Sequence, residues 1–287
     1  MTPRNIQGIL FFLGGLFLFS SVDTTAKYLT AFYSVQLLVW ARFAVHLAIM
    51  LAIVAPGMGR ELVVTRRPWL MILRALMLVV SSLFIQMAFR SQPLAETTAV
   101  FFVTPVLVAL LAGPLLGEQV RAKTWAATLA GFCGVLLIAR PGGTVLGIGL
   151  VYTLAAALCY SLYQILTRKL ADTEPTMRQL FYTALIGTLV MSPIVPPYWT
   201  GEMPPLSHCL LIVSLGVYGG IGHFLVIGAY RTTPASTLSP IMYVQLIWAA
   251  LLGWAVFNHL PDPLSLLGML IIGTAGLSLA LRPSRRT

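Results

Sequence analysis

The stretch GFCGVLLIARP at residues 131–141 has the pattern G-x-x-G-x-x-L-x-x-R-P, and the stretch GTAGLSLALRP at 273–283 repeats it 142 positions later. Sliding the chain along itself by 141 positions also aligns the Ala-Phe-Arg of residues 88–90 with the Ala-Tyr-Arg of 229–231. A nearly constant offset over about 135 residues indicates that the chain contains two copies of one structural unit.

The composition is typical of a membrane protein. Of the 287 residues, 58% are hydrophobic and only 9% are charged, and the mean hydropathy is +0.90. Soluble domains carry about 25% charged residues, so a soluble fold is excluded. The net charge of +10 would suggest a nucleic-acid partner in a soluble protein. Here the basic residues lie between apolar runs, so we predict a lipid bilayer and no nucleic acid as the partner.

The apolar runs have the length of membrane-spanning helices, since a hydrocarbon core about 30 Å thick needs about 20 residues. Backbone groups in lipid must form hydrogen bonds within the protein, and runs of this length do so as helices. We therefore predict an all-α membrane protein with ten transmembrane helices, near residues 6–26, 34–55, 69–89, 94–115, 122–139, 147–167, 176–196, 207–229, 235–257 and 263–281.

The basic residues predict the orientation of these helices, because Lys and Arg in short loops stay in the cytoplasm. With the N-terminus inside, thirteen Lys and Arg residues fall on the cytoplasmic side, and only Lys27, Arg90 and Arg140 fall outside. Both termini are therefore predicted to be cytoplasmic. Arg74 falls within a predicted span, and we expect its side chain to extend to the cytoplasmic interface.

The repeat predicts an inverted architecture of five helices plus five. An odd number of spans in each copy gives the halves, at 1–142 and 143–287, opposite orientations in the bilayer. Inverted repeats place a shared cavity near the bilayer midplane and favour alternating access, so we predict a transporter. No G-x-x-x-x-G-K-[ST] motif occurs, so the transport is predicted to be secondary rather than driven by ATP hydrolysis.

Several short motifs resemble the drug/metabolite transporter superfamily, EamA type, over nearly the whole chain. They are the Leu-Leu-Gly-Glu of residues 115–118, Thr104-Pro105, the Gly131/Gly134 pair and the two Ala-[Phe/Tyr]-Arg turns. The second half departs from the pattern, with Asn258-His259 in place of Gly117-Glu118 and Leu246 in place of Pro105.

The resemblance implies a multi-pass protein of the bacterial inner membrane that transports a small molecule. The chain is similar to exporters of amino acids, so we expect export of aromatic or hydrophobic amino acids. The Val22-Asp23-x-x-Ala26-Lys27 run also resembles importers of riboflavin or S-adenosylmethionine, which is the alternative. The sequence leaves the direction of transport, the exact substrate and the oligomeric state open.

Polar and aromatic residues at mid-depth in the spans are the candidates for substrate binding, because polar groups inside a membrane are costly. The resemblance implies a cavity lined by the helices that carry them. For each aromatic residue the alternative is packing between helices or against lipid. The candidates are Ser82, Gln86, Thr98, Tyr160, Tyr163, Gln164, Tyr218, His223, Tyr243, Gln245 and Trp248. Such a site suits a neutral or zwitterionic metabolite, since a polyanion needs more cations at this depth.

Asp23, Arg42 and His46 form a second set, predicted to be a polar lining or a proton-linked site. Arg42 and His46 lie one helical turn apart and so share a face. The alternative for His46 is a structural hydrogen bond to a neighbouring helix. The alternatives for Asp23 are an ion pair with Arg42 or with its i,i+4 neighbour Lys27, of which Lys27 is the simpler.

Small residues and proline in the spans predict packing sites and hinges. Pro105 lacks an N–H, which predicts a kink in the helix and frees a carbonyl that can face a cavity. Glycines three apart let helices approach closely, and we expect them to form a static scaffold at Gly131, Gly134, Gly273 and Gly276.

Two other function classes are less compatible with the sequence. An integral-membrane enzyme would cluster His, Asp or Glu at one membrane face, whereas the four His and eight acidic residues are scattered. The three Cys residues lack the spacing of metal ligands. We therefore predict no catalytic residue, metal or cofactor. A channel would need a ring-forming filter motif, and none is visible.

Overall fold

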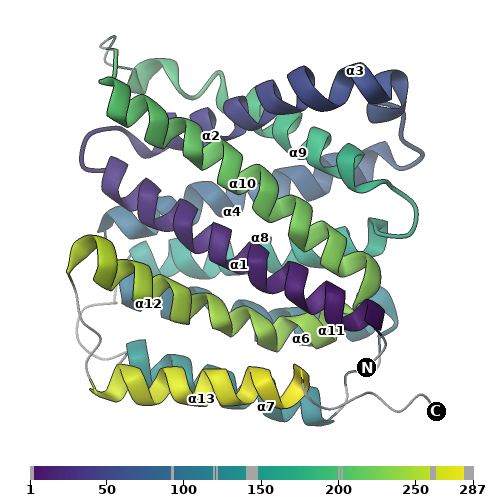
Figure 1. The fold of residues 1–287 in the computed structure, drawn as a ribbon, viewed down its shortest axis with the longest axis vertical. Helices are drawn as coiled ribbons and strands as arrows, with labels where there is room; N and C mark the ends of the chain where they lie inside the picture. Colours follow the sequence, from purple (N-terminus) through teal and green to yellow (C-terminus); the bar gives the residue numbers. More distant parts are fainter. Residues whose placement is uncertain are drawn as a thin grey trace.

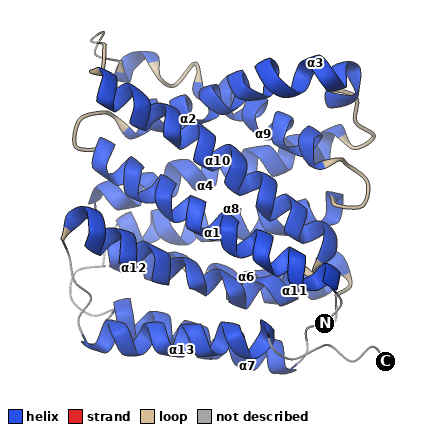
Figure 2. Ribbon diagram, in the orientation of Figure 1, coloured by secondary structure: helices blue, strands red, loops and turns tan. Residues whose placement is uncertain are grey.

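The computed structural model of the protein describes residues 3–91, 94–118, 120, 122–139, 148–199, 201, 203–258 and 263–280. Within these ranges all regular secondary structure is helical and no strand occurs (Figure 2). Five stretches there are long and apolar enough to cross a membrane: Ile6–Leu29, Val35–Leu62, Pro68–Arg90, Ile148–Leu170 and Leu206–Thr232. Two shorter apolar helical stretches are Thr104–Leu116 and Ile241–Phe257.

Each predicted span corresponds to one helix or to one interrupted helix. The continuous helices are α1 (Pro3–Leu29), α4 (Pro68–Ser91), α7 (Ala122–Ala139), α8 (Ile148–Leu170), α9 (Thr176–Met191), α10 (Leu206–Thr232) and α13 (Pro263–Ala280). The second span consists of α2 (Val35–Ile49), a π-helical turn (Met50–Val54) and α3 (Ala55–Met58). A short 3-10 helix (Gly59–Leu62) follows α3, and another (Pro196–Tyr198) follows α9.

The fourth and ninth spans are both interrupted. The fourth consists of α5 (Leu94–Phe101) and α6 (Thr104–Leu116), and the ninth of α11 (Ala235–Leu238), a 3-10 turn (Ser239–Tyr243) and α12 (Val244–Phe257). Pro105 lies at the start of α6, as expected from its missing N–H. The ninth span is interrupted although it has Leu246 at the equivalent position, and Pro240 is the second residue of its 3-10 turn.

The helices pack in pairs that follow the repeat. Helix α1 packs along α10, α4 packs along α8, and α2 packs against both α9 and α10 (Figure 1). Helices α7 and α13 lie together at one end of the molecule, the lower end in Figure 1. The pairs α1·α10 and α8·α4 are equivalent to each other under the repeat, because each joins the first helix of one predicted copy to the third helix of the other.

The departure of Asn258 from the family pattern leaves the local backbone unchanged. Gly117 ends α6 in the left-handed conformation (φ 69°), and Asn258, 141 positions later, ends α12 in the same conformation (φ 57°). Glycine adopts this conformation without steric cost, and asparagine is the side chain that replaces it most readily at a helix C-terminus.

The glycines of α10 allow the close approach of α1 and α2. A Cβ atom at Gly222 would lie 2.7 Å from the Phe19 ring, and one at Gly216 would lie 2.6 Å from Val45. Gly131 of α7 packs directly against the Tyr243 ring, and Gly134 is buried. The environment of Gly273 and Gly276 in α13 lies outside the part of the structure that is described.

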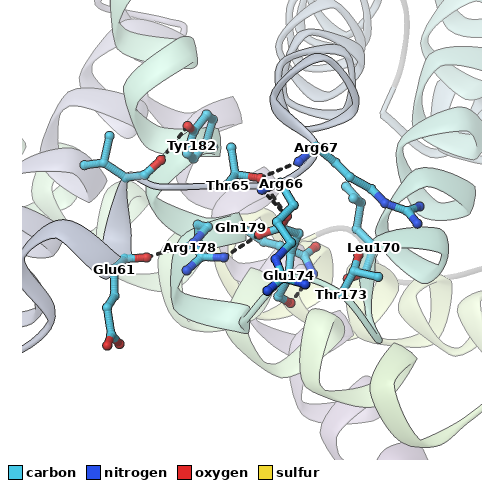
Figure 3. Close-up of polar contacts among 11 residues, drawn as sticks. Glu61, Thr65, Arg66, Arg67, Leu170, Thr173, Glu174, Arg178, Gln179 and Tyr182 are labelled. Atoms are coloured by element: carbon cyan, nitrogen blue, oxygen red, sulfur yellow. Dashed lines mark hydrogen bonds and ion pairs between the residues drawn. The ribbon is translucent and has the colours of Figure 1, made fainter.

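Two polar clusters tie the helices together at the C-terminal end of α8. In the first, the buried carboxylate of Glu174 accepts hydrogen bonds from the Thr65 hydroxyl (2.6 Å), the Arg66 N–H (3.2 Å) and the Arg178 guanidinium (2.6 Å). Figure 3 shows how this cluster joins the connection before α4 to the connection before α9. In the second, Glu118 lies 3.3 Å from both Arg168 and the backbone N–H of Ala235.

Candidate substrate site

A central cavity of about 70 Å³ lies between helices of both halves. Its lining comes from α1, α2, α4, α5, α8, α10 and α12, and it includes Phe19, Asp23, Arg42, Ser82, Thr98, Phe101, Tyr160, His223 and Gln245. A ligand pocket is commonly about 300–1,000 Å³. The cavity is therefore contracted in this conformation and must widen to enclose a metabolite.

The cavity contains one carboxylate and one guanidinium that are not paired with each other. In the described part of the chain, neither Asp23 nor Arg42 has an ion-pair partner within 4.0 Å. The expected ion pair between Asp23 and Lys27 is therefore wrong. Asp23 instead accepts a hydrogen bond from the Gln245 amide (3.3 Å), and Lys27 lies 5.4 Å from the Phe257 ring centroid.

Neighbouring residues hold the Arg42 side chain at the cavity wall. Arg42 Nη2 donates to the Ser82 hydroxyl (3.3 Å), and its guanidinium lies 5.0 Å from the Phe43 ring centroid. The side chain crosses α10 at Gly219, where an added Cβ would come within 3.6 Å of Arg42 Nε. Arg42 thus contacts α10 at Gly219, one turn before His223 on the same helix.

The break between α5 and α6 brings Thr98 and Phe101 to the cavity. Pro105 has no N–H for the Phe101 carbonyl, and the Thr104 hydroxyl donates to that carbonyl instead (2.6 Å). The Ser161 hydroxyl of α8 lies 3.4 Å from the Thr104 carbonyl. Side chains thus replace the backbone hydrogen bonds of the broken helix, as non-helical backbone inside a membrane requires.

Behind the cavity wall, His223 belongs to a chain of hydrogen bonds that includes Tyr163 and Arg74. Tyr163 hydroxyl lies 3.0 Å from His223 Nδ1 and 3.0 Å from Arg74 Nη2. Arg74 is fully buried between α4, α8 and α9, so the expectation that it extends to the interface is wrong. Its partners, which include Thr167 and Thr183, lie far from it in sequence.

The structure brings five of the eleven predicted binding residues to the cavity, together with Asp23 and Arg42. The five are Ser82, Thr98, Tyr160, His223 and Gln245. His46 is buried beside Gly220 rather than in the lining.

The other six predicted residues lie outside the cavity lining. Gln86 and Tyr163 are buried. Gln164 accepts a hydrogen bond from the Tyr230 hydroxyl, and its amide nitrogen lies 3.0 Å from the Met242 sulfur. Tyr218 is 37% exposed on the surface. Tyr243 is buried and Trp248 is partly buried beside Phe17. In the described part of the chain the Tyr243 hydroxyl and the Trp248 N–H lack a hydrogen-bond partner.

Sequence reasoning missed the phenylalanines of the lining and the role of Arg74. Phe19 and Phe101 lie within apolar runs, where a cavity-facing ring has the same pattern as one that faces lipid. Within the ranges that the structure describes, no three His, Cys, Asp or Glu side chains are grouped so that they could hold a metal ion.

The sequence profile of the EamA-like transporter family matches residues 6–140 and again residues 147–281. This chain belongs to the EamA-like transporter family. It is therefore a multi-pass membrane protein of a bacterial transporter family whose members act on small molecules in a lipid bilayer. The profile matches once in each predicted half of this EamA-like chain.

The relatives of this EamA-like chain are transporters with different substrates in their names. An S-adenosylmethionine uptake transporter of Rickettsia bellii is 28% identical over 266 residues, which cover 92% of this chain and 90% of the relative. A riboflavin transporter of Vibrio cholerae is 24% identical over 273 residues, covering 93% and 90%. The pseudopaline exporter CntI of Pseudomonas aeruginosa is 24% identical over 191 residues, covering 66% of each chain.

The fold of this EamA-like chain also matches a solved crystal structure. The two chains superpose with a TM-score of 0.80, with 96% of each chain covered and a sequence identity of 20%.

Proposed function

We propose that this chain is a secondary transporter that moves a metabolite with an α-amino acid group across the bacterial inner membrane. The observation that carries this proposal is the pair of unpaired charges, Asp23 and Arg42, in one cavity. Buried charge without a partner is costly, and a zwitterion supplies a partner to both groups at once. The substrate ammonium would bind Asp23, and its carboxylate would bind Arg42.

The rest of the lining suits the apolar part of such a substrate. Phe19, Phe101 and Tyr160 provide aromatic surface, and few further formal charges are present. Export of an aromatic or hydrophobic amino acid fits these rings. Uptake of S-adenosylmethionine is the second candidate, favoured by four rickettsial relatives of that name at 27–28% identity. Both molecules carry the amino acid group, whereas riboflavin does not.

Alternating access between the halves 1–142 and 143–287, in opposite orientation, is the mechanism we propose. The paired helices α1·α10 and α4·α8 and the two interrupted spans support it, because inverted repeats with broken helices place the site between the two halves. The clusters around Glu118 and Glu174 lie at one end of the bundle, which we assign to the cytoplasm together with both termini. The contracted cavity has to widen during the cycle.

Counterflow in proteoliposomes tests the substrate class. The labelled probes are L-phenylalanine, S-adenosylmethionine and riboflavin, and uptake of either of the first two that saturates with concentration is expected. Asp23→Asn and Arg42→Gln should each raise KM by roughly tenfold or more, because a hydrogen bond to a charged group contributes about 1.5–3 kcal/mol. Asp172→Asn, at an exposed loop position, is the matched control and should leave KM unchanged.

A substrate analogue separates the two charges. L-Phenylalanine methyl ester keeps the ammonium but has no carboxylate. Competition by the ester should therefore remain sensitive to Asp23→Asn and become insensitive to Arg42→Gln. Transport of riboflavin alone, or equal effects of both substitutions on the ester and the free amino acid, would refute the zwitterion site.

A further inference from the structure

Three buried side chains on three different helices form a continuous chain that ends at the cavity. Arg74 of α4, Tyr163 of α8 and His223 of α10 are 0%, 0% and 3% exposed. The Arg74 Nη2 to Tyr163 oxygen distance and the Tyr163 oxygen to His223 Nδ1 distance are both 3.0 Å. The His223 ring lines the cavity, and its centroid lies 4.7 Å from that of the Phe19 ring.

Arg74 is held in a single geometry by acceptors from α8 and α9. Its guanidinium donates to the Thr167 hydroxyl (2.7 Å), the Gln179 carbonyl (3.1 Å) and the Thr183 hydroxyl (2.8 Å), besides Tyr163. The cation also lies over the Tyr163 ring, 4.6 Å from its centroid. Because these contacts fix the guanidinium, the Tyr163 oxygen always faces an N–H donor.

The chemistry of arginine fixes which atom donates and which accepts in the hydrogen bonds among these three side chains. A guanidinium only donates, so the Tyr163 oxygen accepts from Arg74 and its own hydrogen must go elsewhere. In the described part of the chain, the acceptor within reach of that hydrogen is His223 Nδ1. If Nδ1 carried the proton, the buried tyrosine hydrogen would have no acceptor, which is unfavourable. The neutral ring therefore carries its proton on Nε2.

The fully protonated form of His223 is disfavoured by the charges around it. The charged side chains nearest to this region are Arg74, Arg42 and Asp23, of which only Asp23 is negative, and it already accepts from Gln245. A charged imidazole would add a positive group beside Arg74, which has no carboxylate partner in the described residues. The hydrogen bond from Tyr163 requires the same unprotonated Nδ1.

We propose that Arg74 and Tyr163 are positioning residues that fix His223 as the Nε2–H tautomer. The ring then presents one constant hydrogen-bond donor to the cavity, because no described residue is a partner of Nε2. Arg42 crosses the same helix at Gly219, one turn away. A substrate carboxylate would thus meet a cation and a neutral donor together. The role in carboxylate binding rests on the proposed function, whereas the tautomer does not.

Nitrogen NMR tests the tautomer directly. The full-length protein, labelled with ¹⁵N-histidine and reconstituted in lipid nanodiscs, should show His223 with a protonated Nε2 and a bare Nδ1. The signal is assigned by its loss in His223→Phe, since the chain has only four histidines. Tyr163→Phe removes the hydroxyl and keeps the ring, so the share of the Nε2–H tautomer should fall and a signal of the Nδ1–H tautomer should appear.

Two matched variants control for general effects on the fold. Tyr182→Phe removes a hydroxyl that donates to the Val63 carbonyl away from the cavity, and it should leave the His223 signal unchanged. At position 74, Arg74→Lys keeps a donor for Tyr163 and should retain the wild-type tautomer ratio, whereas Arg74→Met should lower the share of Nε2–H. If Tyr163→Phe does not fold, the comparison of Arg74→Lys with Arg74→Met still tests the positioning role.

Transport of labelled L-phenylalanine gives a second readout. If half of the His223 rings present the donor in Tyr163→Phe, the competent fraction halves and KM rises about twofold with Vmax unchanged. A wild-type His223 with its proton on Nδ1, or a tautomer ratio that is unchanged in Tyr163→Phe, would overturn the positioning role. If the spectra are as expected but neither phenylalanine nor S-adenosylmethionine is transported, the tautomer is supported and the proposed function is refuted.

Discussion

Replacing Glu174 by glutamine tests how much its buried carboxylate stabilises the loop end of the bundle. The residue is 1% exposed and accepts hydrogen bonds from Thr65, Arg66 and Arg178 (Figure 3). Burial acts to raise the pKa of Glu174. The hydrogen bonds from Thr65 and Arg178, the charge of Arg178 and the Arg66 N–H outweigh it, so the pKa is below its usual 4.5.

The expected loss follows from what Glu174→Gln leaves behind. Removing one partner of a buried ion pair costs about 3–5 kcal/mol when the other charge is left uncompensated. Arg178 retains a hydrogen bond to the Glu61 carbonyl (2.8 Å), and its side chain is 14% exposed. We therefore expect the free energy of unfolding to fall by about 2–3 kcal/mol, below the full penalty.

Unfolding of the purified protein in mixed micelles, at neutral pH and with increasing SDS, measures this difference. Asp172→Asn is the matched control, because it removes one carboxylate from an exposed position in the same connection.

The effect of Glu174→Gln on stability also depends on pH. A carboxylate whose pKa is lowered on folding stabilises the protein above its unfolded pKa, and this stabilisation is lost as the pH falls through the folded pKa. The gap between wild type and Glu174→Gln should therefore shrink below pH 4.5.

A Glu174→Gln variant that is no less stable than Asp172→Asn at neutral pH would refute the stabilising role of the Glu174 carboxylate. A gap that stays constant as the pH is lowered below 4.5 would also refute it, because the carboxylate charge would then not be the cause.

Two further predictions concern local packing and backbone conformation. Gly222→Ala should lower the free energy of unfolding by about 1–3 kcal/mol, because its Cβ would lie 2.7 Å from the Phe19 ring. Gly57→Ala, where a Cβ would meet no atom within 4 Å, is the control for this substitution, and equal stability of the two variants would contradict the packing argument. Asn258→Ala should cost about 1–2 kcal/mol, since φ is 57°, whereas Asn258→Gly should be neutral. The same unfolding titration measures both, and a neutral Asn258→Ala would exclude a role for the left-handed cap.

Much of the fold follows from properties that act within a few residues along the chain. Apolar runs of the right length must form helices in lipid, and the predicted spans correspond to helical segments of the structure. Pro105 predicted a kink, and the helix is interrupted between Phe101 and Thr104, where the missing N–H of Pro105 leaves the Phe101 carbonyl without its backbone partner. The family match in two parts, at 6–140 and 147–281, agrees with the repeat period in the sequence.

Other parts of the fold depended on contacts that the sequence pattern does not contain. The ninth span is interrupted at a 3-10 turn that contains Pro240, although its residue equivalent to Pro105 is Leu246. Arg74 was expected at the interface because a lone arginine in a span has no evident partner nearby in sequence. Its acceptors are 89 to 109 positions away, on α8 and α9, so only the packed bundle makes its burial favourable.

The sequence alone determined that this protein is a helical membrane protein with two related halves, because hydrophobicity, helix length and repeat period are local or periodic properties. Tertiary structure decided which polar groups meet. Tyr160 lines the cavity and Tyr163 lies behind it, although both are aromatic residues in the same apolar helix. In a membrane protein the lipid-facing surface and the interior are both apolar, so periodicity does not separate them. Only the packing of the helices does.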